Sequence, residues 1–137
     1  MSETTAPTRV LYESSVTAVG NQVSTFLDHG LLIFFGDESP AELHDMSVRH
    51  VATVAGEGPK AGDTIIIGEL SMEILAVGSV VAENLLQLGH LDLKANGQTS
   101  AKLPGDVNVA KQALPLPSPR DAFRIVRGDE PTEEEPS

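Results

Sequence analysis

The sequence predicts an all-β fold, a compact barrel or sandwich of short strands with one or two short connecting helices. Several short segments are rich in β-branched residues or alternate between apolar and polar residues, as strands do. Glycine, proline, asparagine and aspartate separate these segments, and these four residue types favour turns. The expected strands are 10–19, 31–35, 46–54, 63–67, 71–81, 90–95, 106–110 and 122–126.

Turn and helix signals fill the intervals between the strands. Asn96-Gly97 predicts a hairpin turn, since both residues tolerate a positive φ. Residues 39–43 predict a helix of two turns at most, with Ser39 as N-cap, Pro40 in the first turn and Glu42 as the capping-box acid. Residues 82–89 predict a second helix that carries an apolar stripe and stops at Gly89.

The chain reads as one domain between two polar ends. We expect residues 1–8 to be a disordered leading segment, 9–127 to be the folded domain, and 128–137 to be a disordered acidic tail. The stretch VTAVG at 16–20 echoes ILAVG at 74–78, which hints at two similar halves.

Composition excludes several classes of function. The 137 residues include no cysteine, so disulfides, thiolate metal sites and thiol nucleophiles are ruled out. The net charge of −11 argues against a nucleic-acid partner, because phosphate backbones are bound through clustered lysine and arginine. No basic-then-apolar leader and no apolar run of about 20 residues is present. We therefore expect a soluble cytoplasmic protein with no direct membrane insertion.

Common catalytic motifs are missing as well. The sequence contains no G-x-S-x-G elbow, no Gly-Lys-Ser/Thr phosphate loop, and no H-x-H or H-E-x-x-H metal signature. The remaining candidates are carboxylates, hydroxyls and four histidines. His29 lies in a turn and His44 follows the first helix, so both read as surface residues. His90 opens a strand directly after Gly89, where its ring is either structural or aimed at a site.

His50 differs because no turn or cap explains it. It lies in SVRHVATV, where strand alternation places it on one face with Val48, Ala52 and Val54 and turns Arg49 away. A buried histidine with satisfied ring nitrogens is the commoner reading of such a position. In the functional reading, aliphatic neighbours keep the imidazole neutral, as a phosphoryl acceptor must be, and exclude water from a labile phosphoramidate.

The stretch AVGSVVAENLLQLGHLDL at 76–93 resembles the glucitol/sorbitol-specific enzyme IIA component of the bacterial sugar phosphotransferase system. The resemblance runs from about 9 to 126. It includes YESSVTAVG at 12–20, LIFF at 32–35, Pro40-Ala41-Glu42-Leu43, and LPGDVNV at 103–109.

This resemblance implies a phosphotransferase component with a phosphohistidine intermediate. Members of the family accept a phosphoryl group from the histidine phosphocarrier protein and pass it to the glucitol/sorbitol-specific IIB domain of the IIB/IIC transporter during polyol uptake. The strand after the proline-acidic-leucine segment carries the acceptor histidine, which places that role on His50. His90 matches a second histidine of the pattern and is carried over as a supporting ring partner or phosphate ligand. The resemblance implies no cofactor and no metal. It leaves open whether the protein forms a homodimer.

Two other classes compete with this reading. The first is a non-catalytic β-barrel module that regulates or binds a partner on the same scaffold. The second is a metal-dependent enzyme of the cupin type, which would require His50 and His90 to converge with a carboxylate.

Overall fold

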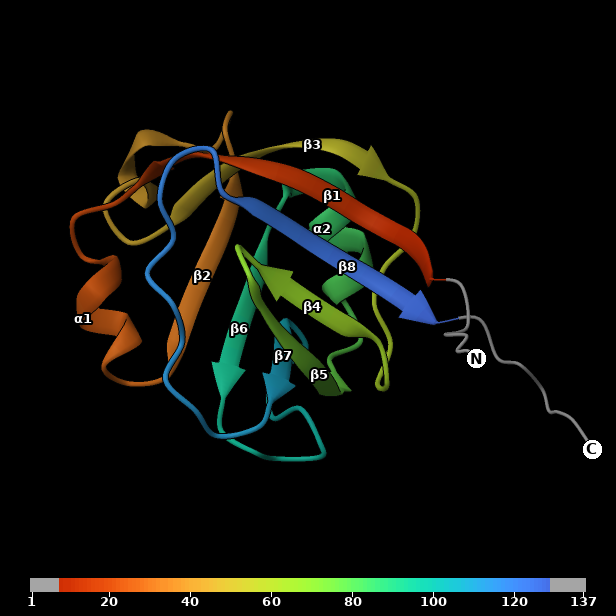
Figure 1. Ribbon diagram of the computed structural model, residues 1–137. Helices are drawn as coiled ribbons and strands as arrows, with labels where there is room; N and C mark the ends of the chain where they lie inside the picture. The colour runs from red at the N-terminus through yellow and green to blue at the C-terminus, as the bar shows by residue number, and fades with distance from the viewer. Residues whose placement is uncertain (1–7, 129–137) are drawn as a thin grey trace, which may run out of the picture.

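The structure, a computed structural model, describes residues 8–128 and shows a closed barrel of eight strands (Figure 1). The predicted all-β barrel is confirmed. The strands are β1 Thr8–Val19, β2 Leu31–Gly36, β3 Val48–Ala55, β4 Thr64–Ile67, β5 Leu70–Val77, β6 Leu91–Ala95, β7 Asp106–Val109 and β8 Ala122–Gly128.

Three short helical elements join the strands. Helix α2, Val81–Leu88, ends at Gly89 in the left-handed conformation, as the sequence predicts. Residues 41–43 form only a 3-10 turn, η1, whose N-cap is Pro40 with no side-chain cap, so the predicted Ser39 capping is wrong. The sequence did not indicate α1, Val23–Leu27, whose β-branched content and single turn give no helical periodicity.

The order of strands around the barrel is β1-β3-β2-β6-β7-β5-β4-β8. Exchanging β1–β4 with β5–β8 reproduces the same ring, so the barrel consists of two topologically equivalent halves. In each half the second and third strands are parallel and the first and third are antiparallel. The echo between 16–20 and 74–78 therefore coincides with a repeat in the topology.

The repeat extends to individual backbone contacts. Gly20 N–H donates to the Ser47 carbonyl at 3.0 Å, and Gly78 N–H donates to the Asp106 carbonyl at 2.8 Å. Each glycine carbonyl then accepts from the first residue of the following helix at 3.3 Å. At each glycine the chain leaves the first strand of its half and turns toward the helix. Because glycine has no side chain, the chain can pass directly against the backbone of the loop that leads into the third strand of that half.

The Asn96-Gly97 turn does not close a hairpin. Gly97 has the expected positive φ of 72°. However, β6 and β7 are parallel, so the segment between them has to cross back along the barrel. The hairpin prediction is wrong because the local turn signal carries no information on which strands pair.

Apolar side chains from every strand fill the barrel. Phe34 and Phe123 stack in its interior with ring centroids 4.2 Å apart and planes 11° from parallel. Tyr12 packs at 5.8 Å from Phe123, and burial raises the pKa of its phenol to about 12. This aromatic cluster forms one wall around His50.

Thr8 begins β1 and Gly128 ends β8. The rest of the expected leading segment and acidic tail lies outside the described residues. Within 8–128, no helix has the length and apolar character needed to cross a bilayer.

Gly78→Ala is expected to lower the free energy of unfolding by about 1–3 kcal/mol, the usual cost of forcing extra atoms into packed backbone. A Cβ at Gly78 would lie 2.2 Å from the Pro104 carbonyl oxygen, which cannot rotate away as a side chain could. Urea unfolding measures the change. Gly128→Ala is the matched control, since nothing lies within 4 Å of its Cβ position; equal effects of the two substitutions would contradict this account.

Candidate functional site

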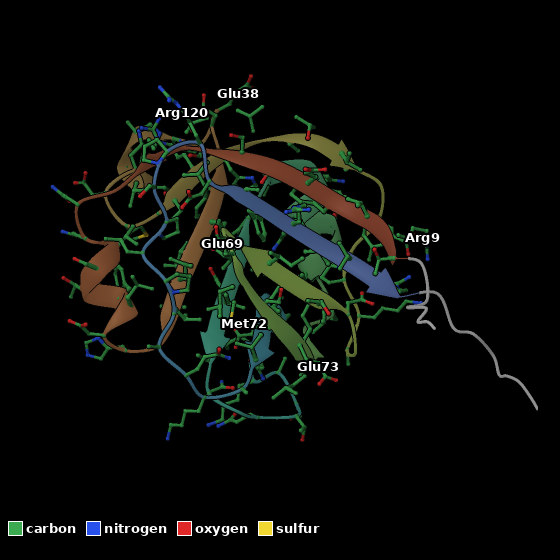
Figure 2. All side chains as sticks on the ribbon, in the orientation of Figure 1. Arg9, Glu38, Glu69, Met72, Glu73 and Arg120 are labelled. Atoms are coloured by element: carbon green, nitrogen blue, oxygen red, sulfur yellow. The ribbon has the colours of Figure 1, made fainter. Side chains whose placement is uncertain are left out.

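His50 lies where β3 separates from β2. β3 pairs with β1 from Val48 to Ala55, but with β2 only over Val48–His50. Beyond His50 the β2-facing edge of β3 borders a groove of about 690 Å³ whose opposite wall is the C-terminal part of α2. The loop after β2 closes one end of the groove, and its Glu38 projects from the molecule at the same end as Arg120 (Figure 2).

The imidazole of His50 is held by one hydrogen bond in an aromatic setting. The residue is only 2% exposed, and its ring meets the rings of Tyr12, Phe34 and Phe123 edge-on at centroid distances of 5.3–6.0 Å. Nε2 lies 2.7 Å from the carbonyl oxygen of Gly89. Because a carbonyl only accepts, this bond assigns the proton to Nε2 and the lone pair to Nδ1. Nδ1 is buried and has no hydrogen-bond partner among the described residues.

Burial keeps this imidazole neutral. Desolvation lowers the pKa of His50 from its ordinary value of 6.5, and it outweighs the Gly89 hydrogen bond and the charge of Asp37, which both favour the protonated form. A neutral ring keeps one nitrogen lone pair available as a nucleophile. The site therefore combines a hydrophobic groove with a neutral imidazole at its base.

Two glycines make the contact between α2 and β3 possible. Gly89 ends α2 with a φ of 66°, and a Cβ there would lie 2.7 Å from the Gly36 nitrogen and 3.2 Å from Nε2 of His50. A Cβ on Gly36 would lie 2.9 Å from the Leu88 carbonyl oxygen. Gly36 is in register with His50 across β2 and β3. Any side chain at either position would push the helix end away from the imidazole.

Alternation along β3 holds around His50 and then ends. Val48 and His50 point inward, while Arg49 points outward, as predicted, and lies 3.9 Å from Asp37. Ala52 and Val54, which were expected to share the buried face, are exposed. The β1–β3 register shifts between Ala52 and Val54, and β3 no longer pairs with β2 there. Val51, Ala52 and Ala55 therefore border the groove instead of filling the core.

His90 lies beside the site without reaching the His50 ring. Its imidazole stacks on Phe35 with centroids 4.2 Å apart and planes 7° from parallel, and its Nε2 is 3.1 Å from Asp92 Oδ1. It is not among the residues that line the groove. The group that the Leu-Gly-His segment brings to His50 is the Gly89 carbonyl, which sequence reasoning missed because a main-chain carbonyl has no residue signature.

The other histidines lie apart from the groove. His29 is exposed after α1, and its Nδ1 is 3.1 Å from the Thr25 carbonyl oxygen. His44 Nε2 is 2.9 Å from the Ser39 carbonyl oxygen. Within residues 8–128, no three histidine or carboxylate side chains gather as a metal site would require.

Comparison with known proteins identifies the family of this chain. Residues 11–122 match the family described as the PTS system glucitol/sorbitol-specific IIA component. The chain belongs to this family. The glucitol/sorbitol-specific EIIA components of Shigella flexneri and of Escherichia coli K12 are each 32% identical to it over 101 residues, covering 74% of this chain and 82% of theirs.

Family membership makes this chain a component of the sugar phosphotransferase system, with a role in phosphoryl transfer. The crystal structure of a PTS system IIA component from Enterococcus faecalis V583 has the same fold. It superposes with a TM-score of 0.69 at 22% identity, covering 81% of this chain and 96% of that one. The resemblance recognised in the sequence is confirmed.

The stability of the protein should report the neutral state of His50. Because the folded protein resists protonating this ring and the unfolded chain does not, the unfolded state binds more protons as pH falls below 6.5. The free energy of unfolding should therefore fall between about pH 7.5 and pH 5.5, and His50→Gln should reduce that fall.

Urea unfolding at the two pH values measures this difference, and His29→Gln serves as the control at an exposed histidine. An identical pH dependence in His50→Gln and the unsubstituted protein would show that His50 does not carry the effect.

Proposed function

We propose that this protein is a phosphocarrier in which His50 accepts a phosphoryl group from the histidine phosphocarrier protein and passes it to the glucitol/sorbitol-specific IIB domain of the IIB/IIC transporter. The single observation that supports His50 most is its neutral imidazole at the base of the apolar groove, anchored through Nε2 to Gly89. Family membership supports the phosphoryl-transfer role. In this proposal the protein acts in the cytoplasm.

The reaction is a displacement at phosphorus between two imidazoles. A bond forms between phosphorus and a ring nitrogen of His50 while the bond between phosphorus and the donor histidine breaks. Each ring keeps the proton on its non-reacting nitrogen, so atoms and charge balance without a cofactor, metal or nucleotide. Docking has to uncover the imidazole, since only 2% of the residue is exposed in the free protein.

The groove supplies the docking surface in this proposal. Large apolar side chains are exposed on both of its walls, Val51 on β3 and Leu86 and Leu88 on α2. Asp37 and Glu38 are the charged residues of its lining. An apolar centre with a polar rim suits a transient complex, and the same groove would serve donor and acceptor in turn.

Phosphoenolpyruvate with the general phosphotransferase proteins should place acid-labile phosphate on this chain. His50→Ala should abolish that labelling because no other imidazole borders the groove among the described residues. Mass spectrometry under neutral conditions, or a radiolabel that is lost in acid, detects the product.

His29→Ala is the control, since His29 is exposed after α1 and away from the groove. Label that persists in His50→Ala would remove His50 as the acceptor. No label on the unsubstituted chain would instead favour a non-catalytic module on the same scaffold.

Leu88→Asp should raise the KM for the phosphoryl donor roughly fivefold or more while changing kcat little, because it places a charge in the docking surface and leaves His50 intact. Steady-state phosphorylation at varied donor concentration separates the two constants. Leu116→Asp is a matched control, since both leucines are 56% exposed and Leu116 does not line the groove. Equal KM values for the two variants would place docking elsewhere.

A further inference from the structure

The two halves of the barrel provide an internal comparison for the His50 site. Gly30, between α1 and β2, and Gly89, between α2 and β6, both have positive φ, 72° and 66°. The antiparallel register of β2 and β6 pairs Leu31 with Lys94 and Phe34 with Leu91. Extending that register by one residue at one end and two at the other pairs Gly30 with Ala95 and Gly89 with Gly36. Gly36 pairs with His50 on β3, and Ala95 pairs with Val109 on β7, so Gly36 and Ala95 correspond between the halves and their partners Gly89 and Gly30 occupy equivalent positions.

Their carbonyl groups have different partners. The Gly30 carbonyl accepts from the Ala95 N–H at 2.9 Å and so extends the β2–β6 ladder. Within residues 8–128 no equivalent bond joins the Gly36 N–H to Gly89. The Gly89 carbonyl accepts from His50 Nε2 instead. The Gly30 carbonyl thus continues the sheet. The Gly89 carbonyl is diverted from the sheet, because it accepts its hydrogen bond from a side chain.

The imidazole itself is also peculiar to one half. Val16 pairs with His50, and the equivalent Ile74 pairs with Val109, so Val109 occupies the counterpart position of His50. Valine has no group that could bond a carbonyl. The diverted carbonyl and the histidine that receives it therefore occur together, in the half that carries the groove.

His90 is the residue best placed to hold the diverted carbonyl, because the Gly89 carbonyl belongs to the Gly89–His90 peptide. The His90 ring is fixed on two sides, by its stack on Phe35 and by its contact with Asp92. Phe35 itself pairs with Arg49, next to His50, across β2 and β3. Leu31 takes the equivalent position in the other half, opposite Lys94, with no ring to stack on.

We propose that His90 is a positioning residue for His50: by stacking on Phe35 it holds the Gly89–His90 peptide so that its carbonyl fixes the His50 imidazole as the Nε2–H tautomer. This inference rests on the proposed phosphoryl transfer at His50. The His90 ring touches no reacting atom and acts through the peptide alone. A ring held in one tautomer and orientation loses less freedom in the transition state than a free ring does.

The experiment uses the full chain labelled with ¹⁵N at histidine, and two variants of His90. His90→Ala removes both the stack and the Asp92 contact. His90→Phe keeps an aromatic ring against Phe35 and loses only the Asp92 contact. His29→Ala is the control for removing a histidine elsewhere. Nitrogen chemical shifts of the imidazole, assigned by comparison with His50→Gln, report which His50 nitrogen carries the proton in the unphosphorylated protein.

In the unsubstituted protein, and in His29→Ala, we expect His50 to carry its proton on Nε2 alone. His90→Ala should mix the two tautomers and slow phosphorylation by about tenfold, the lower end of the effect seen when a group that orients a metal-ligating histidine is lost. His90→Phe should restore the Nε2–H signal and a rate within about twofold of the unsubstituted protein.

An unchanged tautomer and rate in His90→Ala would overturn the proposal, and so would equal losses in His90→Ala and His90→Phe when both remain folded. A proton on Nδ1 in the unsubstituted protein would also overturn it. The tautomer is read without any phosphoryl donor, so a failure of His50 to accept phosphate would reject the proposed function and leave this result standing.

Discussion

The hydrogen bond from His50 Nε2 to the Gly89 carbonyl is the contact around which this site is built. A buried imidazole that lost its one hydrogen-bond partner among residues 8–128 would incur about 1–3 kcal/mol of unpaired polar burial. Burial keeps the ring neutral against the opposing effect of this bond, the bond assigns the proton to Nε2, and the ring lies against the edges of three aromatic rings. The bond also ties the end of α2 to β3, and these two elements form the opposite walls of the groove.

That contact needs the helix end and two strands to approach closely. Gly36 and Gly89 permit the approach, because a Cβ on either one would press against main-chain atoms that cannot move aside. The same approach leaves the outer part of β3 without a β2 partner, so the groove is a consequence of how the barrel closes at this point. Exposed apolar side chains flank this gap, Val51 on the strand and Leu86 and Leu88 on the helix.

Local patterns predicted most of the fold, for reasons that the structure makes plain. All eight expected strands occur, but the one expected over 71–81 ends at Val77, and Val81 begins α2 instead. Helix α2 was predicted because Gly89 provides an unambiguous stop. The failures were α1 and the Asn96-Gly97 hairpin, where a single helical turn and a long-range parallel pairing left no local trace. Ser39 was misread because a capping motif is also compatible with a 3-10 turn.

The sequence by itself determined the fold class, the family and the choice of His50 as the candidate acceptor, because strand periodicity and the order of short motifs are properties of residues near one another in the chain. Tertiary structure alone decided what surrounds that imidazole. The Gly89 carbonyl, the stacked pair of Phe35 and His90, and the groove wall on α2 come from segments separated along the chain and joined only when the barrel closes. A main-chain carbonyl is common to every residue, so only its position in space distinguishes the one that holds His50.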